Sequence, residues 1–180
     1  ALKVVSASIT RDTRFKERFI RESRINARLT HPNIVQVYDV GSHGQWLYLV
    51  LEYIRGGDLN QRIDSGMHMI DLVRVIQDMC RALDYAHGAG IIHRDVKPEN
   101  VILVEHDEDP DFAKILDFGI AKLHDDVANQ DSDTSPLGND AKLTQHGVTI
   151  GTPTYIAPEQ AYAQSVDGRA DLYSLSVMMY

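Results

Sequence analysis

The sequence predicts a single domain of the α+β class, and three observations support this prediction. Its 180 residues, 43% of them hydrophobic and 24% charged, are enough to bury one core. Short segments rich in β-branched and aromatic residues, bounded by turn-forming residues, dominate the first third of the chain. Apolar residues at helical spacing dominate most of the rest. The composition excludes the collagen-like, wholly disordered and disulfide-stapled classes.

The net charge argues against two kinds of partner. The 18 Lys and Arg residues against 26 Asp and Glu give a net charge of −8. This is the wrong sign for a domain that neutralises nucleic-acid phosphates or an anionic membrane. The longest apolar runs, such as residues 46–51, are far shorter than the ~20 residues of a membrane-spanning helix. We therefore expect neither nucleic acid nor a membrane to contact this segment.

A stripe of residues at spacings of three and four predicts a helix over residues 12–29, after a short extended run at the start of the chain. Phe15, Glu22 and Asn26 lie on this stripe. A carboxylate on an inward face needs a cation or hydrogen-bond donors to offset its desolvation. Lys3 is the candidate partner for Glu22, and the alternative is a solvated Glu22 at the edge of the stripe.

The middle of the chain predicts a strand pair followed by a long helix. Residues 34–38 and 46–54 are rich in β-branched and aromatic residues, and the glycine-containing turn 41–44 separates them, so we expect an antiparallel pair. Helical spacing is clearest over residues 71–87. Cys80 lies in this helix. It cannot form an internal disulfide, and its apolar surroundings predict a buried side chain.

The later part of the chain predicts a second strand pair and a final helix. Residues 101–104 and 113–116 read as short strands on either side of the acidic turn 105–111. The final helix begins near Arg169. Residues 123–141 hold five Asp and no Lys or Arg, so this stretch cannot bury enough apolar surface to offset its ordering entropy, and we expect a mobile insert.

The strongest signal for function is the run from His93 to Asn100, whose sequence is HRDVKPEN, followed by Asp117-Phe118-Gly119. Together with Lys3, Glu22 and the later Ala-Pro-Glu at residues 157–159, these residues form an ordered set. The chain resembles the eukaryotic-like serine/threonine protein kinases of the bacterial type, whose signature places the same residues in the same order. The resemblance covers the whole chain.

The resemblance implies a two-lobed kinase-like fold, truncated at both ends, with a β-rich amino-terminal lobe and a helical carboxy-terminal lobe. Residues 1–180 would form a partial kinase domain. Residues 1–52 would be the remainder of the first lobe, from the family's third strand onward, and residues 53–180 the hinge and the second lobe through part of the family's helix F. Asp171 resembles the acid of that helix, which holds the backbone of the His-Arg-Asp loop.

Phosphoryl transfer asks a protein mainly to position the nucleophile and to neutralise charge on the phosphates, and the matched residues suit these tasks. Asp95 would accept or orient the proton of the substrate hydroxyl. Asn100 and Asp117 supply hard oxygen ligands suited to Mg²⁺. By resemblance, Lys97 would point at the transferring phosphate and mark Ser/Thr specificity. Lys3 would bind the α- and β-phosphates while Glu22 holds it in place.

The resemblance also implies an adenine site. The backbone carbonyl of Glu52 and the backbone amide of Ile54 would meet the adenine edge, and Ala1 and Ile102 would sandwich the ring. Asp58 matches a position that commonly reaches the nucleotide ribose. A short acid after two glycines is equally well explained as a helix N-cap, so both interpretations of Asp58 stay open.

The stretch between Asp117 and residue 159 corresponds to the kinase activation segment. Kinases with an Arg directly before the catalytic Asp, as Arg94 is here, are commonly switched by a phosphate on this segment that pairs with that Arg. We predict phosphorylation of Thr144, of Thr149 or of both, with Thr144 the first choice. Thr152 sits where the family places a threonine that contacts the catalytic Asp and Lys.

The implied function is an ATP- and Mg²⁺-dependent protein serine/threonine kinase that acts on protein substrates. Its kinase domain would be cytoplasmic, and a membrane anchor elsewhere in a longer chain stays open. By itself the 180-residue piece should be nearly inactive, because no glycine-rich loop precedes Lys3. One alternative is a pseudokinase scaffold or interaction module of the same fold. Another is a small-molecule phosphotransferase, which would lack the peptide-positioning segment at residues 151–159. The histidines form no zinc-binding motif.

Overall fold

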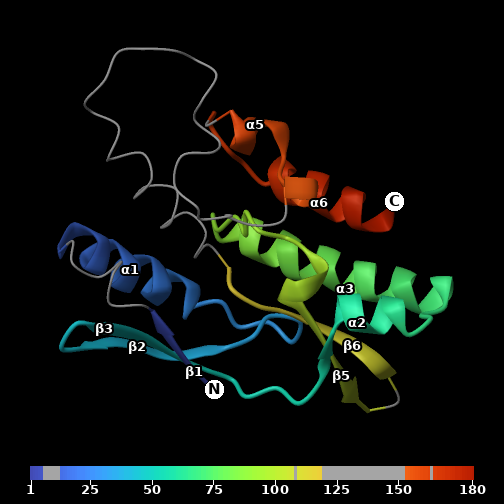
Figure 1. The fold of residues 1–180 in the computed structure, drawn as a ribbon, viewed down its shortest axis with the longest axis horizontal. Helices are drawn as coiled ribbons and strands as arrows, with labels where there is room; N and C mark the ends of the chain where they lie inside the picture. The colour runs from blue at the N-terminus through green and yellow to red at the C-terminus, as the bar shows by residue number, and fades with distance from the viewer. Residues whose placement is uncertain (6–12, 108, 119–152, 163) are drawn as a thin grey trace.

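The computed structural model describes residues 1–5, 13–107, 109–118, 153–162 and 164–180. Two antiparallel three-stranded sheets organise this part of the chain (Figure 1). The first has the order β1-β3-β2 and the second the order β4-β5-β6. The strands are β1 (Leu2–Val5), β2 (Val37–His43), β3 (Trp46–Leu51), β4 (Gly57–Asp58), β5 (Val101–His106) and β6 (Asp109–Ile115).

Helices accompany the two antiparallel sheets, which confirms the α+β class. The helices among the described residues are α1 (Thr13–Asn26), α2 (Leu59–Asp64), α3 (Met69–Gly88), α5 (Pro158–Ala161) and α6 (Arg169–Met179), with 3₁₀ turns η1 (Pro98–Asn100) and η3 (Pro153–Tyr155). Within that same part of the chain, no helix has both the length and the apolar content needed to cross a bilayer.

A small first core lies between α1 and the first sheet. Phe15 and Phe19, one helical turn apart, are buried against Leu47 and Leu49 of β3. Alternate residues of a strand point to the same face, so Leu47 and Leu49 both face the helix. The predicted inward stripe of the first helix is therefore confirmed, with the helix ending at Asn26 rather than Leu29.

A larger second core lies between α3 and the second sheet. One face of α3 buries Val75, Met79 and Leu83, and these pack in one cluster with Val101 and Ile115 of the sheet. Figure 1 shows α3 lying along β5 and β6, with α6 beyond the helix. This second core carries the residues that position the predicted catalytic loop.

Residues 33–35, between α1 and β2, join the two cores. Ile34 forms a parallel bridge with Ile115 of β6. The amide of Val35 donates to the carbonyl of Ile115 at 2.9 Å, and the amide of Ile115 donates to the carbonyl of Asn33 at 2.8 Å. The side-chain amide of Asn33 donates to the carbonyl of Ala113 at 2.8 Å. The chain segment that follows α1 is thus fastened to the second sheet.

Three local predictions were wrong. The predicted turn 41–44 lies largely within β2, and only Gly44 has a left-handed backbone, at φ 59°. A Cβ on Gly41 would lie 2.4 Å from the hydroxyl of Tyr48, so this glycine makes room for a cross-strand ring. The predicted acidic turn is shorter than expected, because β5 and β6 pair to within three residues of each other. Cys80 is exposed, because it lies about 100° around the helix from buried Met79.

Candidate active site

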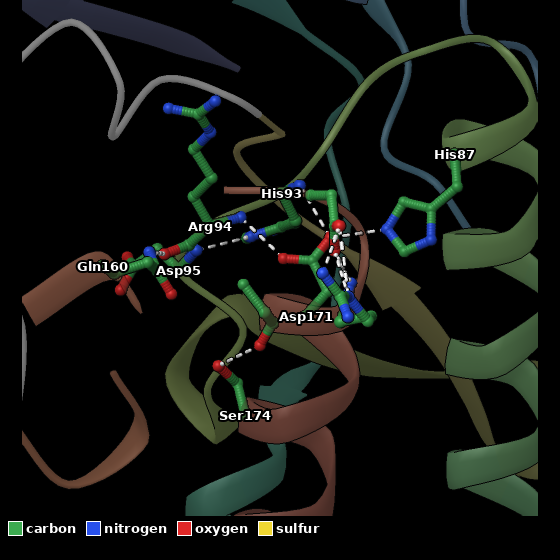
Figure 2. Close-up of polar contacts among 10 residues, drawn as sticks. His87, His93, Arg94, Asp95, Gln160, Asp171 and Ser174 are labelled. Atoms are coloured by element: carbon green, nitrogen blue, oxygen red, sulfur yellow. Dashed lines mark hydrogen bonds and ion pairs between the residues drawn. The ribbon is translucent and has the colours of Figure 1, made fainter. Parts of the chain in front are cut away.

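The loop that carries the His-Arg-Asp motif is held from below by Asp171, which is fully buried in the first turn of α6. Its carboxylate accepts from the backbone amides of His93 at 2.8 Å and Arg94 at 2.7 Å. Nε2 of His87, on α3, donates to the same carboxylate at 2.7 Å (Figure 2). Three donors offset the desolvation of this acid. The expected structural role of Asp171 is confirmed.

His93 fixes the other side of the loop with its ring. Its Nε2 lies 2.6 Å from the carbonyl of Leu116, which can only accept, so Nε2 carries the proton. Nδ1 is therefore free to accept from the amide of Asp95, at 3.2 Å. The edge of the Phe118 ring packs against the imidazole, with 4.7 Å between ring centroids. One fully buried histidine thus links the Asp95 loop to the Asp117-Phe118 strand end.

Asp95, Lys97 and Asn100 meet in one cluster. Nζ of Lys97 lies 2.8 Å from Oδ2 of Asp95. Nδ2 of Asn100 donates to the carbonyl of Asp95 at 2.7 Å and to its Oδ2 at 2.9 Å. An amide that donates through nitrogen leaves its oxygen available as an acceptor or metal ligand. The turn η1 brings Asn100 back beside Asp95.

Asp117 lies next to this cluster, because the amide of Leu116 donates to the carbonyl of Asn100 at 2.8 Å. Asp117 has a left-handed backbone, φ 61°, which is uncommon for a residue with a Cβ. Its Oδ2 pairs with Nζ of Lys3 at 2.5 Å. The structure therefore brings together Lys3, Asp95, Asn100 and Asp117, which are separated by up to 114 positions in the sequence.

The predicted pair between Lys3 and Glu22 is wrong for this structure. Glu22 instead accepts from its neighbour Arg21, with Nη2 and Oε1 at 3.0 Å, while Lys3 is taken by Asp117. A lysine ammonium is a compact point charge and binds the carboxylate that approaches it. On the same helix, the side-chain amide of Asn26 donates to the carbonyl of Phe118. Sequence reasoning placed Asn26 on the helical stripe and assigned it no partner.

A narrow pocket lies beside Asp117. Its walls include Asn26, Leu49, Leu116, Asp117 and Phe118. Its free interior is about 20 Å³, room for about one water molecule. This pocket is therefore too small to be the nucleotide site.

The predicted hinge leaves its backbone groups available. The carboxylate of Glu52 is bound by Nζ of Lys114 at 2.6 Å and by the amide of Gln36 at 3.3 Å. By contrast, the carbonyl of Glu52 and the amide of Ile54 have no hydrogen-bond partner among the described residues. Ile102 is half-buried on β5, opposite Asp58 in the sheet.

Ala1 is exposed and runs beside the end of β3, since its carbonyl accepts from the amide of Leu51 at 2.8 Å.

Asp58 caps α2. Its Oδ1 accepts from the amide of Gln61 at 2.8 Å, and its Oδ2 accepts from the side-chain amide of the same residue at 2.7 Å. The N-cap interpretation is confirmed. A carboxylate can accept more than two hydrogen bonds, so the ribose role stays a prediction.

Arg94 has the second left-handed backbone of the site, with φ 69°. Its guanidinium points away from Asp171 in Figure 2 and has no polar partner among the described residues. Thr144, Thr149 and Thr152 lie outside the described residues, as does the acidic stretch 123–141.

Sequence reasoning missed one close contact to this loop. The side-chain amide of Gln160, on α5, donates to the carbonyl of Arg94 at 2.8 Å. The two residues are separated by 66 positions. The only available signal was that Gln160 directly follows Ala157-Pro158-Glu159.

Two side chains of this site offer oxygen ligands for a divalent metal ion. No group of three or more His, Cys, Asp and Glu side chains that could hold a metal occurs in the described parts of the chain. Magnesium is commonly bound through one or two carboxylates, with waters and substrate phosphates as further ligands. One carboxylate, Asp117, and one free amide oxygen, on Asn100, fit that pattern.

Comparison with known proteins supports the resemblance to protein kinases. A family model described as the protein kinase domain matches residues 1–180. The serine/threonine-protein kinase pkn3 of Myxococcus xanthus is 40% identical over 182 residues, covering 99% of this chain and 31% of its own length. The serine/threonine-protein kinase PknB of Mycobacterium leprae is 38% identical over 186 residues, covering 100% of this chain and 27% of its own length.

Solved structures agree with the sequence comparison. The crystal structure of the Mycobacterium tuberculosis PknI kinase domain superimposes with a TM-score of 0.72 at 32% identity, covering 99% of this chain and 60% of that chain. The chain belongs to the protein kinase family and has its two-lobed fold. It spans about a third or less of the length of the curated relatives it matches. Members of this family use ATP, normally with a divalent metal ion.

Proposed function

We propose that this chain is the catalytic part of a protein serine/threonine kinase that transfers the γ-phosphate of Mg·ATP to Ser and Thr hydroxyls of protein substrates. The observation that carries the proposal is the contact of Asp95 with Lys97 and Asn100, directly beside Asp117. The kinase names of its relatives support the reaction class.

Asp95 orients the substrate hydroxyl and accepts its proton as the oxygen attacks the γ-phosphorus. The bond between the γ-phosphorus and the β-γ bridging oxygen breaks, and ADP leaves. Lys97, 2.8 Å from Asp95, places a positive charge where the transferring phosphoryl group develops negative charge. The side chain of Asp95 is 35% exposed, so an approaching peptide can reach it.

Asn100, through Oδ1, and Asp117, through its carboxylate, would hold Mg²⁺. When bound, the ion would supply positive charge that offsets the negative charge of the nucleotide phosphates. The amide nitrogen of Asn100 would keep its hydrogen bonds to Asp95. The same side chain would therefore hold the base through its nitrogen and the metal ion through its oxygen. We propose that Lys3 exchanges Asp117 for the α- and β-phosphates of the nucleotide, and that Glu22 then becomes its partner.

The adenine edge would bind to the backbone carbonyl of Glu52 and the amide of Ile54, which have no hydrogen-bond partner in the described parts of the chain. Ala1 and Ile102 would pack on the two faces of the ring. Asp58 would add a contact to the ribose while it caps α2. These assignments follow the division into residues 1–52 and 53–180 that we propose for the two lobes.

Regulation is proposed to act through Arg94, whose guanidinium has no polar partner among the residues described. A phosphate on Thr144 or Thr149 would pair with it. Thr152 would contact Asp95 and Lys97. We also propose a cytoplasmic location for this kinase domain.

The test is a phosphorylation assay on the full-length protein with radiolabelled ATP and a generic basic protein. We expect Asp95→Asn to reduce transfer by at least ~10²-fold, because a positioned general base contributes about 10²–10⁴-fold. Asp84→Asn is the matched control, since Asp84 is exposed on α3 and its carboxylate makes no hydrogen bond or ion pair with the described residues of the loop. Phosphopeptide mapping of the same reaction locates phosphate on Thr144 or Thr149.

A pseudokinase scaffold is the rival function. It predicts that wild type and Asp95→Asn give equal and negligible transfer while both still bind partners. Equal activity of the two proteins would therefore reject the proposed function. The presence of Lys3, Asp95, Asn100 and Asp117 in one site favours the enzyme.

A further inference from the structure

The backbone around Asp95 is hydrogen-bonded by side chains. Asp171 accepts from the amides of His93 and Arg94, at 2.8 and 2.7 Å. Asn100 donates to the carbonyl of Asp95 at 2.7 Å. The peptide unit between Arg94 and Asp95, whose polar groups are the carbonyl of Arg94 and the amide of Asp95, lies between these anchors. The orientation of this peptide unit determines the direction in which the side chain of Asp95 leaves the backbone.

Two side chains hold that peptide unit. The amide of Asp95 reaches Nδ1 of His93 at 3.2 Å, a contact within the loop. The carbonyl of Arg94 accepts from Nε2 of Gln160 at 2.8 Å. Among the described residues, Gln160 makes the only hydrogen bond to this unit from outside the loop. Figure 2 shows Gln160 and Asp171 reaching the loop from different segments.

The unit needs such a tether because Arg94 has φ 69°. A residue with a Cβ persists in this region only where the surrounding structure over-determines it. Asp171 holds the amide side of Arg94 and leaves its carbonyl side to Gln160. Loss of the Gln160 bond would let the peptide unit turn toward a more ordinary conformation, and the Asp95 carboxylate would move with it.

Gln160 is itself held in the orientation that donates. Its Oε1 accepts from the amide of Ala157 at 3.4 Å, so its nitrogen faces Arg94. The turn η3, shortly before α5, is fixed separately, because the hydroxyl of Ser174 donates to the carbonyl of Tyr155 at 2.6 Å. The side-chain amide of Gln160 therefore belongs to a segment, η3 and α5, that other hydrogen bonds hold in place.

We propose that Gln160 is a positioning residue for phosphoryl transfer, which holds Asp95 in its working orientation through the carbonyl of Arg94. This inference rests on the proposed kinase function. Gln160 touches neither substrate nor nucleotide in this scheme, and it acts on the rate of transfer rather than on binding of Mg·ATP.

The experiment uses the full-length protein with Gln160→Glu, which keeps the size of the side chain and removes its donor. Gln160→Met, which removes all polar atoms at similar length, is a second variant. Gln164→Glu is the matched control, because Gln164 is exposed four residues later. We would measure kcat, KM for ATP, the Kd of Mg·ATP and the thermal midpoint, with kcat normalised to the nucleotide-binding fraction.

We expect kcat to fall about ten-fold or more in both Gln160 variants, since a misplacement of ~1 Å can reduce a rate by ~10²-fold. KM and Kd for the nucleotide and the thermal midpoint should match wild type, and Gln164→Glu should match in every measurement. An unchanged kcat would overturn the inference. A parallel fall of kcat, nucleotide affinity and thermal midpoint would also overturn it, because it would indicate a merely structural role.

The two proposals fail differently. If wild type transfers no phosphate, or if Asp95→Asn is as active as wild type, the proposed function fails. If Asp95→Asn is inactive while both Gln160 variants keep the wild-type kcat, the kinase function stands and the role of Gln160 is rejected.

Discussion

At the scale of single residues, His31 is held neutral by its surroundings. Its Nδ1 accepts from the amide of Asn33 at 3.1 Å, and its ring lies 5.2 Å from that of Tyr85. Burial lowers the pKa of His31 below its ordinary value of 6.5; nearby Asp78 opposes this effect and Arg81 adds to it. A proton on Nδ1 would also remove the acceptor that Asn33 uses.

This environment predicts a stability that depends on pH. The unfolded chain binds a proton at His31 more readily than the folded chain, so the free energy of unfolding should fall as pH drops through about 6.5. The decline should level off below the lowered folded pKa. His31→Asn keeps an acceptor for the Asn33 amide and cannot titrate. Urea unfolding between pH 7.5 and 5.5 should therefore show a shallower pH dependence for this variant than for wild type, and parallel curves would contradict the assignment.

The residues of the site differ in how well sequence could predict their contacts. Asp95, Lys97 and Asn100 lie within six positions, so a tight turn brings them together and their cluster could be predicted. The partner of Lys3 depends on where α1 and the Asp117 strand end lie relative to β1, which no local pattern specifies. The motif order suggested Glu22, whereas the structure has Asp117. Gln160 reaches Arg94 across 66 positions, beyond any spacing rule.

At the scale of elements, α3 stabilises the second core through one face. Met79 is completely buried on that face, whereas Met69, in the first turn of the same helix, is 74% exposed. We expect Met79→Ala to lower the free energy of unfolding by about 2–5 kcal/mol, because it removes buried methylenes and leaves a cavity.

Met69→Ala is the matched control for this change. It makes the same substitution in the same helix, and an exposed site should change stability by no more than about 0.5 kcal/mol. Denaturant unfolding of the full-length protein would compare the two. Equal losses would show that the face of α3 has been assigned wrongly.

Element prediction succeeded where one face is buried. The periodicity of α1 and α3 follows their contact with a sheet, so both helices could be predicted. The α2 helix was not predicted separately, because six residues are too few to show a period. The extent of β2 was misjudged because Gly41 resembles a turn residue in sequence, while in the sheet it makes room for Tyr48.

At the scale of the whole molecule, the two cores differ in size. The first has four fully buried side chains, Phe15, Phe19, Leu47 and Leu49, whereas the second spans α3, the second sheet and part of α6. Local stability follows the density of buried apolar contacts. We expect amide hydrogen exchange to be faster in α1 and β1–β3 than in the buried face of α3.

Hydrogen exchange followed by mass spectrometry of the full-length protein would measure this difference. Peptides from residues 75–86 should be the most protected. Added Mg·ATP should slow exchange near β1 and at residues 116–118, because the nucleotide would contact Lys3 and Asp117. Equal protection of the two cores would indicate a single cooperative unit instead.

The fold class and the family could be predicted from sequence at this scale, because the order of the motifs fixes the order of the elements that carry them. The relative placement of the two sheets could not, since it depends on contacts such as Ile34 with Ile115 that follow no local pattern.

The attachment of residues 33–35 to β6 also determines how α1 can move. The last turn of the helix lies near this attachment and Leu29 is buried in the second core, so the chain has a fulcrum at that end. A 14-residue helix is ~21 Å long, and each ~10° of rotation about a fixed end displaces the other end by ~4 Å. Glu22 lies four residues, or ~6 Å, from the fixed end, so the same rotation would move it by ~1 Å relative to Lys3 while the second core stayed intact. The helix α1 is thus attached to the second core at its carboxy-terminal end, while Phe15 and Phe19, nearer its other end, pack in the first core.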